Sequence, residues 1–486
     1  MKLLLASSEL HPYSKTGGLA DMVGSLGKAL ASEGHQVGIV TPWYQGTDRK
    51  YSDFKKLDWE LDLPLGDTLE SGEIWYREPQ KNLIVYFVKH PAFYERNGIY
   101  NEGGLDYADN AQRYLFLSKA VVNLARYLPW KPEIVHLHDW QVGLVPLMIK
   151  HQAWRDGWKA APAAVLTIHN LAYQGLFSAE AYQFSNLPNY YFHAEGVEQY
   201  GNMNSLKSAI EFADVITTVS PRYAREIMTE EYGCGLDAIL RRRQDRLTGI
   251  LNGVDYDEWN TERNVCLTHS YSAGKLEPKA KLKSELQLDL GLPVKPHVPI
   301  FGNITRLVDQ KGVDIQLGAL EEMLSADIQF VCLGSGSAEF EQGYRELAAR
   351  FPGKVGVRIG YDHCLAHRIE AGCDFYLMPS RFEPCGLNQM YSLRYGAIPI
   401  VRRTGGLDDS VIDIGEDQEK ATGIKFTEYS VRALSKAIRK ALVLYEHQEL
   451  YRHYRDNGMR SDFSWEKTGD EYLEVYRQAI EYAAFA

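Results

Sequence analysis

The sequence predicts an α/β protein made of two doubly wound domains, each with a mostly parallel sheet. Short apolar runs typical of buried strands alternate with amphipathic helical stretches along most of the chain. Several of these runs end in polar or glycine-rich turns, at the edge where ligands of open parallel sheets bind. The length of 486 residues exceeds what one hydrophobic core usually organises, so more than one domain is expected.

The first βαβ unit is expected at the amino terminus. Residues 2–8 form a buried-strand pattern, a glycine turn follows, and residues 22–30 carry apolar side chains at helical spacing. The turn contains Lys15-Thr-Gly-Gly18, which places a cation beside glycines that allow close approach of the backbone. It lacks the G-x-G-x-x-G spacing of a dinucleotide fingerprint. Residues 37–41 form the next strand.

Two later strands of the amino-terminal half end in polar side chains. Residues 132–140 form a strand that ends at Asp139, and residues 165–170 form another that ends at His169. A further βα unit is expected at residues 214–220, because Pro221 suits the first turn of a helix. Residues 42–110 are rich in turns and aromatic side chains, and we expect them to be excursions from the sheet.

A domain junction is expected between residues 241 and 299, where the chain is basic, then polar, and contains several prolines. A second series of βα units follows it. Its expected strands are residues 299–305, 328–333, 355–359, 375–378 and 398–401.

The turn after residues 375–380 combines features suited to a sugar nucleotide. Glu383 lies at the carboxyl end of a strand, where its carboxylate can accept bonds from sugar hydroxyls. The amides of Gly386, Leu387 and Asn388 open the next helix and can face an anion. Cys385 lies between Glu383 and Gly386. It is interpreted as a small packing residue rather than a nucleophile, because its motif contains no base that could activate the thiol.

Composition excludes several classes of partner. The formal net charge of -11 argues against a nucleic-acid partner, and no apolar run is long enough to cross a bilayer. The six cysteines lie far apart in the sequence without a C-x-x-C pair, so neither a disulfide framework nor a zinc site is expected. A reducing, cytoplasmic compartment fits these observations.

Taken together, the motifs resemble those of the bacterial glycogen synthase and plant starch synthase family of retaining glycosyltransferases. The resemblance covers essentially the whole chain and rests on seven motifs in order: Lys15-Thr-Gly-Gly18, His136-Leu-His-Asp-Trp140, Thr167-Ile-His-Asn170, Leu251-Asn-Gly-Val-Asp255, Thr305-Arg-Leu-Val-Asp-Gln-Lys-Gly312, Glu383-Pro-Cys-Gly-Leu387 and Thr404-Gly-Gly-Leu407. It implies a GT-B fold, in which two Rossmann-like domains face a central cleft. The expected domains are residues 1–250 on the acceptor side, residues 251–465 on the donor side, and a final helix in residues 466–486 that packs back on the first domain.

The resemblance also implies a reaction, which is the transfer of glucose from ADP-glucose to the nonreducing end of an α-1,4-glucan with retention at the anomeric carbon. The resemblance implies no cofactor or metal. The sequence agrees, because it contains no convincing Asp-x-Asp metal motif. The implied location is the cytoplasm, or the plastid stroma for a mature plant chain. The catalytic residues implied are Asp139, His169, Arg306, Lys311 and Glu383. The donor-binding residues implied are Lys15, Gly17, Gly18, Asn252, Tyr361, Cys385, Gly386, Leu387 and Asn388.

Individual roles follow from the same resemblance. Arg306 and Lys311 are expected to bind the diphosphate, and Lys15 to lie near it. The physical reason is that the leaving diphosphate gains negative charge, which fixed cations and amides stabilise. Glu383 is expected to hold donor-sugar hydroxyls, and Tyr361 to lie against the base. Asp139, His169 and Asn252 are expected to surround the glucose.

Two positions depart from related glycosyltransferases. Many GT-B enzymes carry a second glutamate where this chain has Tyr391, and the glycogen synthase family also lacks it. Asn388 stands where threonine is expected in many members, which affects a side-chain contact but not the backbone amide.

Other interpretations of single residues and of the whole chain remain open. His136 and His138 share one strand face and are interpreted as a satisfied core pair, and Asp408-Asp409 as a solvated turn or helix start. For the whole chain, the alternatives are a GT-B transferase with a small acceptor and a glucan-binding protein without catalysis. No residue distinguishes adenine from uracil in the donor.

Overall fold

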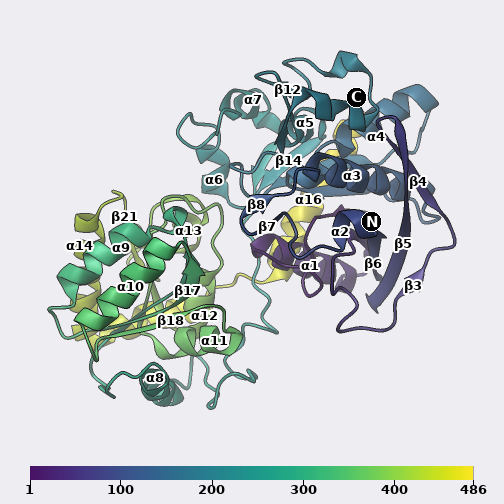
Figure 1. Ribbon diagram of the computed structural model, residues 1–486. Helices are drawn as coiled ribbons and strands as arrows, with labels where there is room; N and C mark the ends of the chain where they lie inside the picture. The colour runs from purple at the N-terminus through teal and green to yellow at the C-terminus, as the bar shows by residue number, and fades with distance from the viewer. Residues whose placement is uncertain (485–486) are drawn as a thin grey trace. The chain divides into compact units, whose positions relative to one another are not determined.

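A computed structural model describes residues 1–484, which form two compact units (Figure 1). Unit 1 contains Met1–Val219, Ala224–Gly253 and the chain from Trp465 onward, whereas unit 2 contains Ser220–Tyr223 and Val254–Ser464. The chain leaves unit 1 after Gly253 and returns at Trp465. Residues 485 and 486 of the expected final segment lie outside the described residues.

Unit 1 is built on a ten-stranded sheet with the order β15-β14-β10-β9-β1-β2-β6-β5-β3, in which β4 also pairs with β5. All neighbours from β15 to β6 are parallel, and β3, β4 and β5 add an antiparallel edge. The strands are β1 (Lys2–Ala6), β2 (Gln36–Pro42), β3 (Lys55–Lys56), β4 (Leu61–Leu65), β5 (Thr68–Gln80), β6 (Leu83–Lys89), β9 (Ile134–His138), β10 (Ala163–Ile168), β14 (Val215–Thr218) and β15 (Leu247–Gly249).

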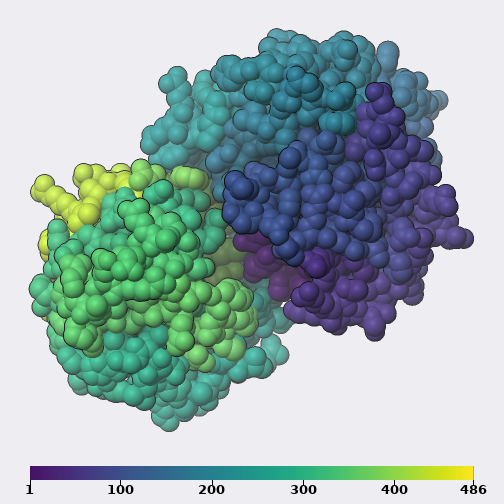
Figure 2. Space-filling model, in the orientation of Figure 1, coloured from purple at the N-terminus to yellow at the C-terminus, as the bar shows by residue number. Residues whose placement is uncertain are grey.

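The central strands are apolar on both sides because both faces of the sheet are covered. Leu3, Leu4 and Leu5 of β1 have no exposed surface. Polar side chains can therefore reach a ligand at the carboxyl ends of the strands, where the strands give way to turns and loops. The edge strands differ from the central ones, because β3 is exposed and β5 has mostly exposed or half-buried residues. In the space-filling view, purple atoms of the amino-terminal part of the chain lie at the surface (Figure 2).

Residues 42–110 differ from the expectation of excursions from the sheet. They supply β5 and β6, and β6 pairs in parallel with β2 inside the main sheet. Strand β5 was missed because Ile74 is its one buried residue and its polar residues show no regular alternation. Strand β6 was missed although it is a continuous apolar run.

The helices of unit 1 cover both faces of its sheet. In α1, the buried residues Val23, Leu26 and Leu30 follow helical spacing and face the sheet. The last helix, α16, packs its buried Tyr472 and Tyr476 into the same core and lies beside α1 (Figure 1). The helices are α1 (Gly18–Ser32), α2 (Pro91–Tyr94), α3 (Asn110–Tyr127), α4 (Val145–Asp156), α5 (Ser205–Phe212), α6 (Pro221–Glu226, shared with unit 2), α7 (Asp237–Arg242) and α16 (Trp465–Ala484).

Short elements complete unit 1. They are two small sheets, β11 (Leu176–Phe177) with β13 (Asn202–Asn204) and β12 (Glu198–Gln199), and β7 (Asn101–Glu102) with β8 (Leu105–Asp106), and the 3-10 turns η1 (Trp140–Val142), η2 (Ala179–Ser185), η3 (Asn189–Tyr191) and η4 (Gln244–Arg246).

Unit 2 contains a six-stranded sheet with the order β18-β17-β16-β19-β20-β21, and every pair is parallel. Successive residues alternate between two cores, since Phe301 and Phe375 pack on one face and Ile300 and Tyr376 on the other. The strands are β16 (Ile300–Leu307), β17 (Gln329–Gly336), β18 (Val355–Ile359), β19 (Phe375–Met378), β20 (Ile398–Arg402) and β21 (Ile424–Phe426).

Helices lie on both faces of this sheet, as a doubly wound fold requires. Side-chain caps begin several of them, for example Asp362, whose carboxylate accepts from the Leu365 amide at 2.8 Å. The helices are α8 (Glu277–Asp289), α9 (Val313–Met323), α10 (Ala338–Arg350), α11 (His363–Gly372), α12 (Asn388–Tyr395), α13 (Gly405–Ser410), α14 (Val431–Glu446) and α15 (Gln448–Arg460), and η5 (Asp309–Lys311) is a 3-10 turn.

A disulfide in unit 2 contradicts the expectation from cysteine spacing. Cys266 and Cys364 are bonded at a sequence separation of 98 and join the segment after the unit boundary to the start of α11. The expectation failed because distance along the sequence says nothing about which cysteines the fold brings together. Cys234, Cys332, Cys373 and Cys385 are not part of a disulfide bond.

Within residues 1–484, none of the helices is both long and apolar enough to cross a membrane.

Candidate functional site

The predicted residues Glu383 and Lys311 meet at the carboxyl ends of the strands in unit 2. Lys311 Nζ lies 2.6 Å from Glu383 Oε2, and Ser380 Oγ donates to the same oxygen at 2.9 Å. Glu383 is buried, and its Oε1 accepts no hydrogen bond from any of the described residues. The carboxylate is therefore held rigidly by one oxygen, while the other remains available to an incoming hydroxyl.

Arg306 is a second cation at the same edge, near the end of β16. Its side chain is exposed and forms no hydrogen bond or ion pair with residues 1–484. Unlike Lys311, whose charge is balanced by Glu383, Arg306 keeps its full positive charge available for an anion.

The turn between β19 and α12 depends on glycine. Gly386 has φ of 70°, a left-handed conformation in which a Cβ atom would lie 2.6 Å from Gln389 Oε1 and 2.9 Å from Leu407 Cδ2. A Cβ on Gly405 would lie 2.0 Å from the Glu383 carbonyl oxygen. The two turns are thus packed backbone against backbone, which fixes the position of Glu383.

Leu387 and Asn388 lie at the start of α12, as expected. The Asn388 side chain turns back to the sheet, where its Nδ2 donates to the Ile304 carbonyl and to the Tyr376 hydroxyl, both at 2.7 Å. The amide side chain therefore ties α12 to β16, the strand that carries Arg306.

Two other predicted residues differ in accessibility. Tyr361, in the turn between β18 and α11, is 87% exposed, so one ring face can stack on a planar ligand. Cys385 is a buried thiol outside any disulfide, which agrees with the packing interpretation. Tyr391, which replaces the second glutamate, stacks on Trp259 with ring centroids 3.7 Å apart.

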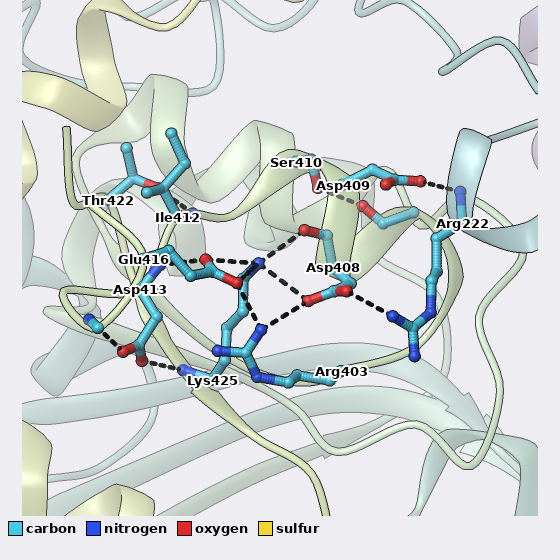
Figure 3. Close-up of polar contacts among 12 residues, drawn as sticks. Arg222, Arg403, Asp408, Asp409, Ser410, Ile412, Asp413, Glu416, Thr422 and Lys425 are labelled. Carbon is cyan, nitrogen blue, oxygen red and sulfur yellow. Dashed lines mark hydrogen bonds and ion pairs between the residues drawn. The ribbon is translucent and has the colours of Figure 1, made fainter.

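Asp408 and Asp409 do not form the solvated turn that was one of the expectations. They lie in α13, and Asp408 contacts Lys425 at 3.0 Å and Arg222 at 3.2 Å (Figure 3). Asp409 accepts from the Arg222 amide at 2.6 Å. The turn interpretation was wrong because Arg403 and two basic side chains from farther along the chain, Arg222 and Lys425, converge on Asp408. The alternative of a helix start is confirmed, since Asp408 lies in the first turn of α13.

Glu416 completes this network. Its carboxylate contacts Lys425 at 2.9 Å, and Arg403 lies against it (Figure 3). Burial raises the pKa of Glu416, but the Asp413 amide, Lys425 and Arg403 outweigh that effect and lower it to about 2. The network braces the turn behind Glu383 from the side of α13 and β21.

In unit 1, Asp139 and His169 lie together at the carboxyl ends of β9 and β10. Asp139 Oδ1 accepts from the His169 amide at 2.7 Å, and the Asp139 backbone has φ of 60°, a strained conformation for a residue with a side chain. Burial raises the pKa of Asp139 to about 7, although hydrogen bonds from the His169 and Asn170 amides oppose the shift.

His169 is the first of three neighbouring histidines, and the other two, His138 and His136, lie deeper in unit 1. His169 Nε2 lies 3.1 Å from His138 Nδ1, and His136 bonds to Tyr476 at 2.9 Å and Thr167 at 2.6 Å. Burial lowers the pKa of both His136 and His169 to about 3, and it also lowers that of His138. All three are neutral at pH 7, and the hydrogen bonds of His136 agree with the core interpretation.

The glycine turn is held by a buried carboxylate, Glu9, that the sequence analysis did not single out. Glu9 is buried, and its carboxylate accepts from the Gly17 amide at 3.3 Å and from the Thr16 hydroxyl at 2.6 Å. The Gly17 amide is therefore directed at Glu9, while Lys15 pairs with Asp21 at 2.7 Å. The sequence signal that could have identified this contact is an acidic residue shortly after a buried strand and before a turn rich in backbone amide donors.

Asn252 lies at the end of unit 1, one residue before Gly253. It is buried, and its Oδ1 has no hydrogen-bond partner among the described residues. A buried polar atom without a partner costs free energy, which is typical of a position that a ligand completes.

Comparisons with known proteins cover nearly the whole chain. Residues 2–242 match the family model of the starch synthase catalytic domain, and residues 291–460 match that of glycosyl transferases group 1. The chain is 45% identical to a glycogen synthase from Anaeromyxobacter dehalogenans, with 98% of this chain and 99% of that protein covered. It is 40% identical to a glycogen synthase from Thermosipho melanesiensis, at 99% coverage of both.

A solved structure agrees in fold. The catalytic domain of starch synthase IV from Arabidopsis thaliana, bound to ADP and acarbose, superposes with a TM-score of 0.91 at 33% identity, covering 99% of each chain. A sucrose-phosphate synthase from Thermosynechococcus elongatus has a TM-score of 0.62 at 17% identity and shares the fold.

Proposed function

Since the chain belongs to the glycogen synthase and starch synthase family of GT-B glycosyltransferases, we propose that its donor is ADP-glucose and its acceptor the nonreducing end of an α-1,4-glucan. The expected glycosyltransferase class and glycogen or starch synthase function are confirmed by the relatives. The adenine donor is supported by the ADP in the Arabidopsis starch synthase IV structure.

One observation carries the assignment of the diphosphate site. Arg306 is a cation without a protein partner among the described residues, at the sheet edge that also holds the Lys311–Glu383 pair. As the glycosidic bond to the donor breaks, negative charge grows on the diphosphate. Arg306 is positioned to stabilise that charge, and the start of α12 near Gly386, Leu387 and Asn388 adds backbone amides.

The remaining roles are proposals of the same kind. Glu383 accepts hydrogen bonds from glucose hydroxyls through its Oε1, and the exposed Tyr361 stacks on the base. In unit 1, the neutral His169 contacts the glucose with Asp139 and Asn252, and Lys15 contacts phosphate. Transfer proceeds on one face of the sugar, with retention of configuration.

We propose that no metal or other cofactor takes part, because the unpaired Arg306 and the backbone amides at the start of α12 supply the positive charge that a metal would otherwise bring. Treatment with a chelator should leave the rate of glucose transfer unchanged. A loss of activity that added Mg²⁺ restores would refute this part of the proposal.

The proposed partners are the nucleotide sugar and the glucan, without nucleic acid or membrane. The net charge of -11 supports the absence of a nucleic-acid partner. We also propose a cytoplasmic location, and recovery of the protein in a membrane pellet after cell fractionation would contradict it.

The test compares two donors with glycogen as acceptor. We expect kcat/KM for ADP-glucose to exceed that for UDP-glucose, whereas equal values or the reverse order would overturn the donor assignment. Arg306→Ala should lower kcat/KM about 100-fold or more. Arg350→Ala, which removes an exposed arginine on α10 paired with Glu321, is the matched control and should leave the rate unchanged.

A further inference from the structure

A group of metal-ligating side chains lies in unit 2, where the segment after Val254 meets α11. Glu258 comes from that segment, and His363 and His367 are one helical turn apart on α11. One carboxylate oxygen of Glu258 and one ring nitrogen of each histidine lie within 4.8 Å of one another. None of the three belongs to the residues proposed for glucose transfer.

The first two side chains have no competing partner. Neither the Glu258 carboxylate nor the His363 ring forms a hydrogen bond or ion pair with residues 1–484, and no described lysine or arginine pairs with Glu258. Glu258 is half-buried. A partly buried carboxylate beside two imidazoles is poorly balanced without a cation.

The third side chain, His367, is held in a fixed orientation. It is 1% exposed, and its Nδ1 lies 2.8 Å from the Tyr395 hydroxyl and 3.1 Å from Asn264 Nδ2. The Tyr395 hydroxyl in turn donates to the Asn260 carbonyl at 3.3 Å, which leaves it free to accept from Nδ1. An acceptor such as the Tyr395 hydroxyl, bonded to Nδ1–H, orients a metal-bound histidine and leaves Nε2 for the metal.

The disulfide holds the two halves of the group together. Cys364 follows His363 directly, and Cys266 lies in the same segment as Glu258. Asn264, between Glu258 and Cys266, adds its contact with His367. The ligands are therefore brought together by covalent and hydrogen bonds that do not need the ion, which reduces the entropy lost on binding.

From this arrangement we propose that Glu258, His363 and His367 bind a divalent transition metal of the zinc class. Two imidazoles and one carboxylate are a common zinc ligand set, with water as the fourth ligand. Carboxylate–imidazole mixtures favour such ions over Mg²⁺ and Ca²⁺, which prefer oxygen ligands alone. The bound ion would clamp the segment after Val254 onto α11 and stabilise unit 2.

The test uses full-length protein without a polyhistidine tag, stripped with a chelator and titrated with Zn²⁺ alone in a calorimeter. We expect one saturable site per chain and a higher melting temperature with Zn²⁺. His363→Ala and Glu258→Gln change accessible side chains, so they should fold, and each should weaken binding about 100-fold or more, because loss of an outer contact alone costs 10–100-fold. His297→Ala, an exposed histidine elsewhere in unit 2, should bind Zn²⁺ as the parent does.

Co²⁺ gives a second readout, since its absorption bands in visible light report tetrahedral coordination. The parent and His297→Ala should show these bands, and the two ligand variants should not. No saturable Zn²⁺ binding by the parent would overturn the proposal. Binding that survives in both ligand variants would also overturn it, because the ion would then lie elsewhere on the chain.

Discussion

At the scale of single residues, the two cations of the candidate site differ in whether they have a charged partner. Lys311 is neutralised by Glu383 at 2.6 Å, whereas the guanidinium of Arg306 is exposed and unpaired within the described chain. Lys311 therefore has a structural role as well as a proposed catalytic role, because its charge compensates a buried carboxylate. This difference leads to distinct expectations for substitutions at the two positions.

Lys311→Met should destabilise unit 2 by about 3 kcal/mol, because it leaves Glu383 buried without a counter-charge. The double variant Lys311→Met with Glu383→Gln should recover most of that loss, while glucose transfer stays abolished. Urea denaturation and initial rates on the same samples measure both quantities. If the double variant were no more stable than Lys311→Met, the ion pair would not be the source of the loss.

Asp139 should make the stability of unit 1 depend on pH. Its pKa is about 7 in the folded protein and about 3.9 when unfolded, so the folded state holds a proton between these values. Stability from this residue is present at low pH and falls as pH rises towards 7. Asp139→Asn, which keeps the acceptor oxygen, should therefore gain on the order of 2–4 kcal/mol relative to the parent between pH 4 and pH 8.

Urea denaturation across that pH range measures the effect. Asp48→Asn, at an exposed position of the same unit, is the control and should follow the parent. Parallel curves for the parent and Asp139→Asn would show that the buried carboxyl titrates normally.

At the scale of elements, the turn from β19 to α12 shows how glycines position the Glu383 side chain. Gly386 takes a left-handed conformation, and Gly405 allows the Glu383 carbonyl to approach within a distance that any Cβ atom would prevent. The strand ends, the helix start and α13 are therefore fixed relative to one another by close backbone packing and by the ion network around Asp408.

Gly386→Ala should cost about 1–3 kcal/mol in stability, because alanine at this φ is strained and its Cβ would contact Gln389 and Leu407. The displaced turn should also raise KM for the donor. Gly274→Ala is the matched control, because a Cβ atom there has no neighbour within 4 Å. An unchanged melting temperature and KM for Gly386→Ala would mean that the turn adapts without moving Glu383.

Buried parallel strands were the easiest elements to predict from sequence. Expected residues 375–378 correspond to β19 (Phe375–Met378), and expected residues 398–401 to β20 (Ile398–Arg402), because continuous apolar runs between polar turns have few alternatives. The expected fold class is confirmed by the solved relative. Strand β6 is an exception, since it was missed although it is apolar and pairs in parallel with β2. Strand β5 was missed because it buries little and its polar residues follow no regular alternation.

The candidate site was predictable to the extent that it follows strand ends. Asp139, His169, Arg306 and Glu383 all lie where the strand pattern placed them. Glu9, the disulfide and the partners of Asp408 could not be predicted, since each depends on contacts between segments distant in sequence. Spacing alone carries no information about those contacts.

At the scale of the whole molecule, the disulfide links residues 266 and 364 within unit 2 only. Opening this 98-residue loop should lower the stability of unit 2 by about 2–4 kcal/mol, chiefly by increasing the entropy of its unfolded chain. Calorimetry on Cys266→Ser should therefore show an earlier transition for unit 2 and an unchanged one for unit 1. Cys234→Ser, at an exposed free cysteine, is the control, and a matching shift in that variant would contradict the interpretation.

The return of the chain to unit 1 has a consequence for the order of events during synthesis. Helix α16 begins at Trp465 and supplies Tyr472 and Tyr476 to the core that β1 and α1 begin. All of unit 2 is therefore translated before the amino-terminal core can close. A ribosome-bound chain would carry a finished unit 2 beside an open unit 1, whose exposed apolar surface is what a chaperone recognises.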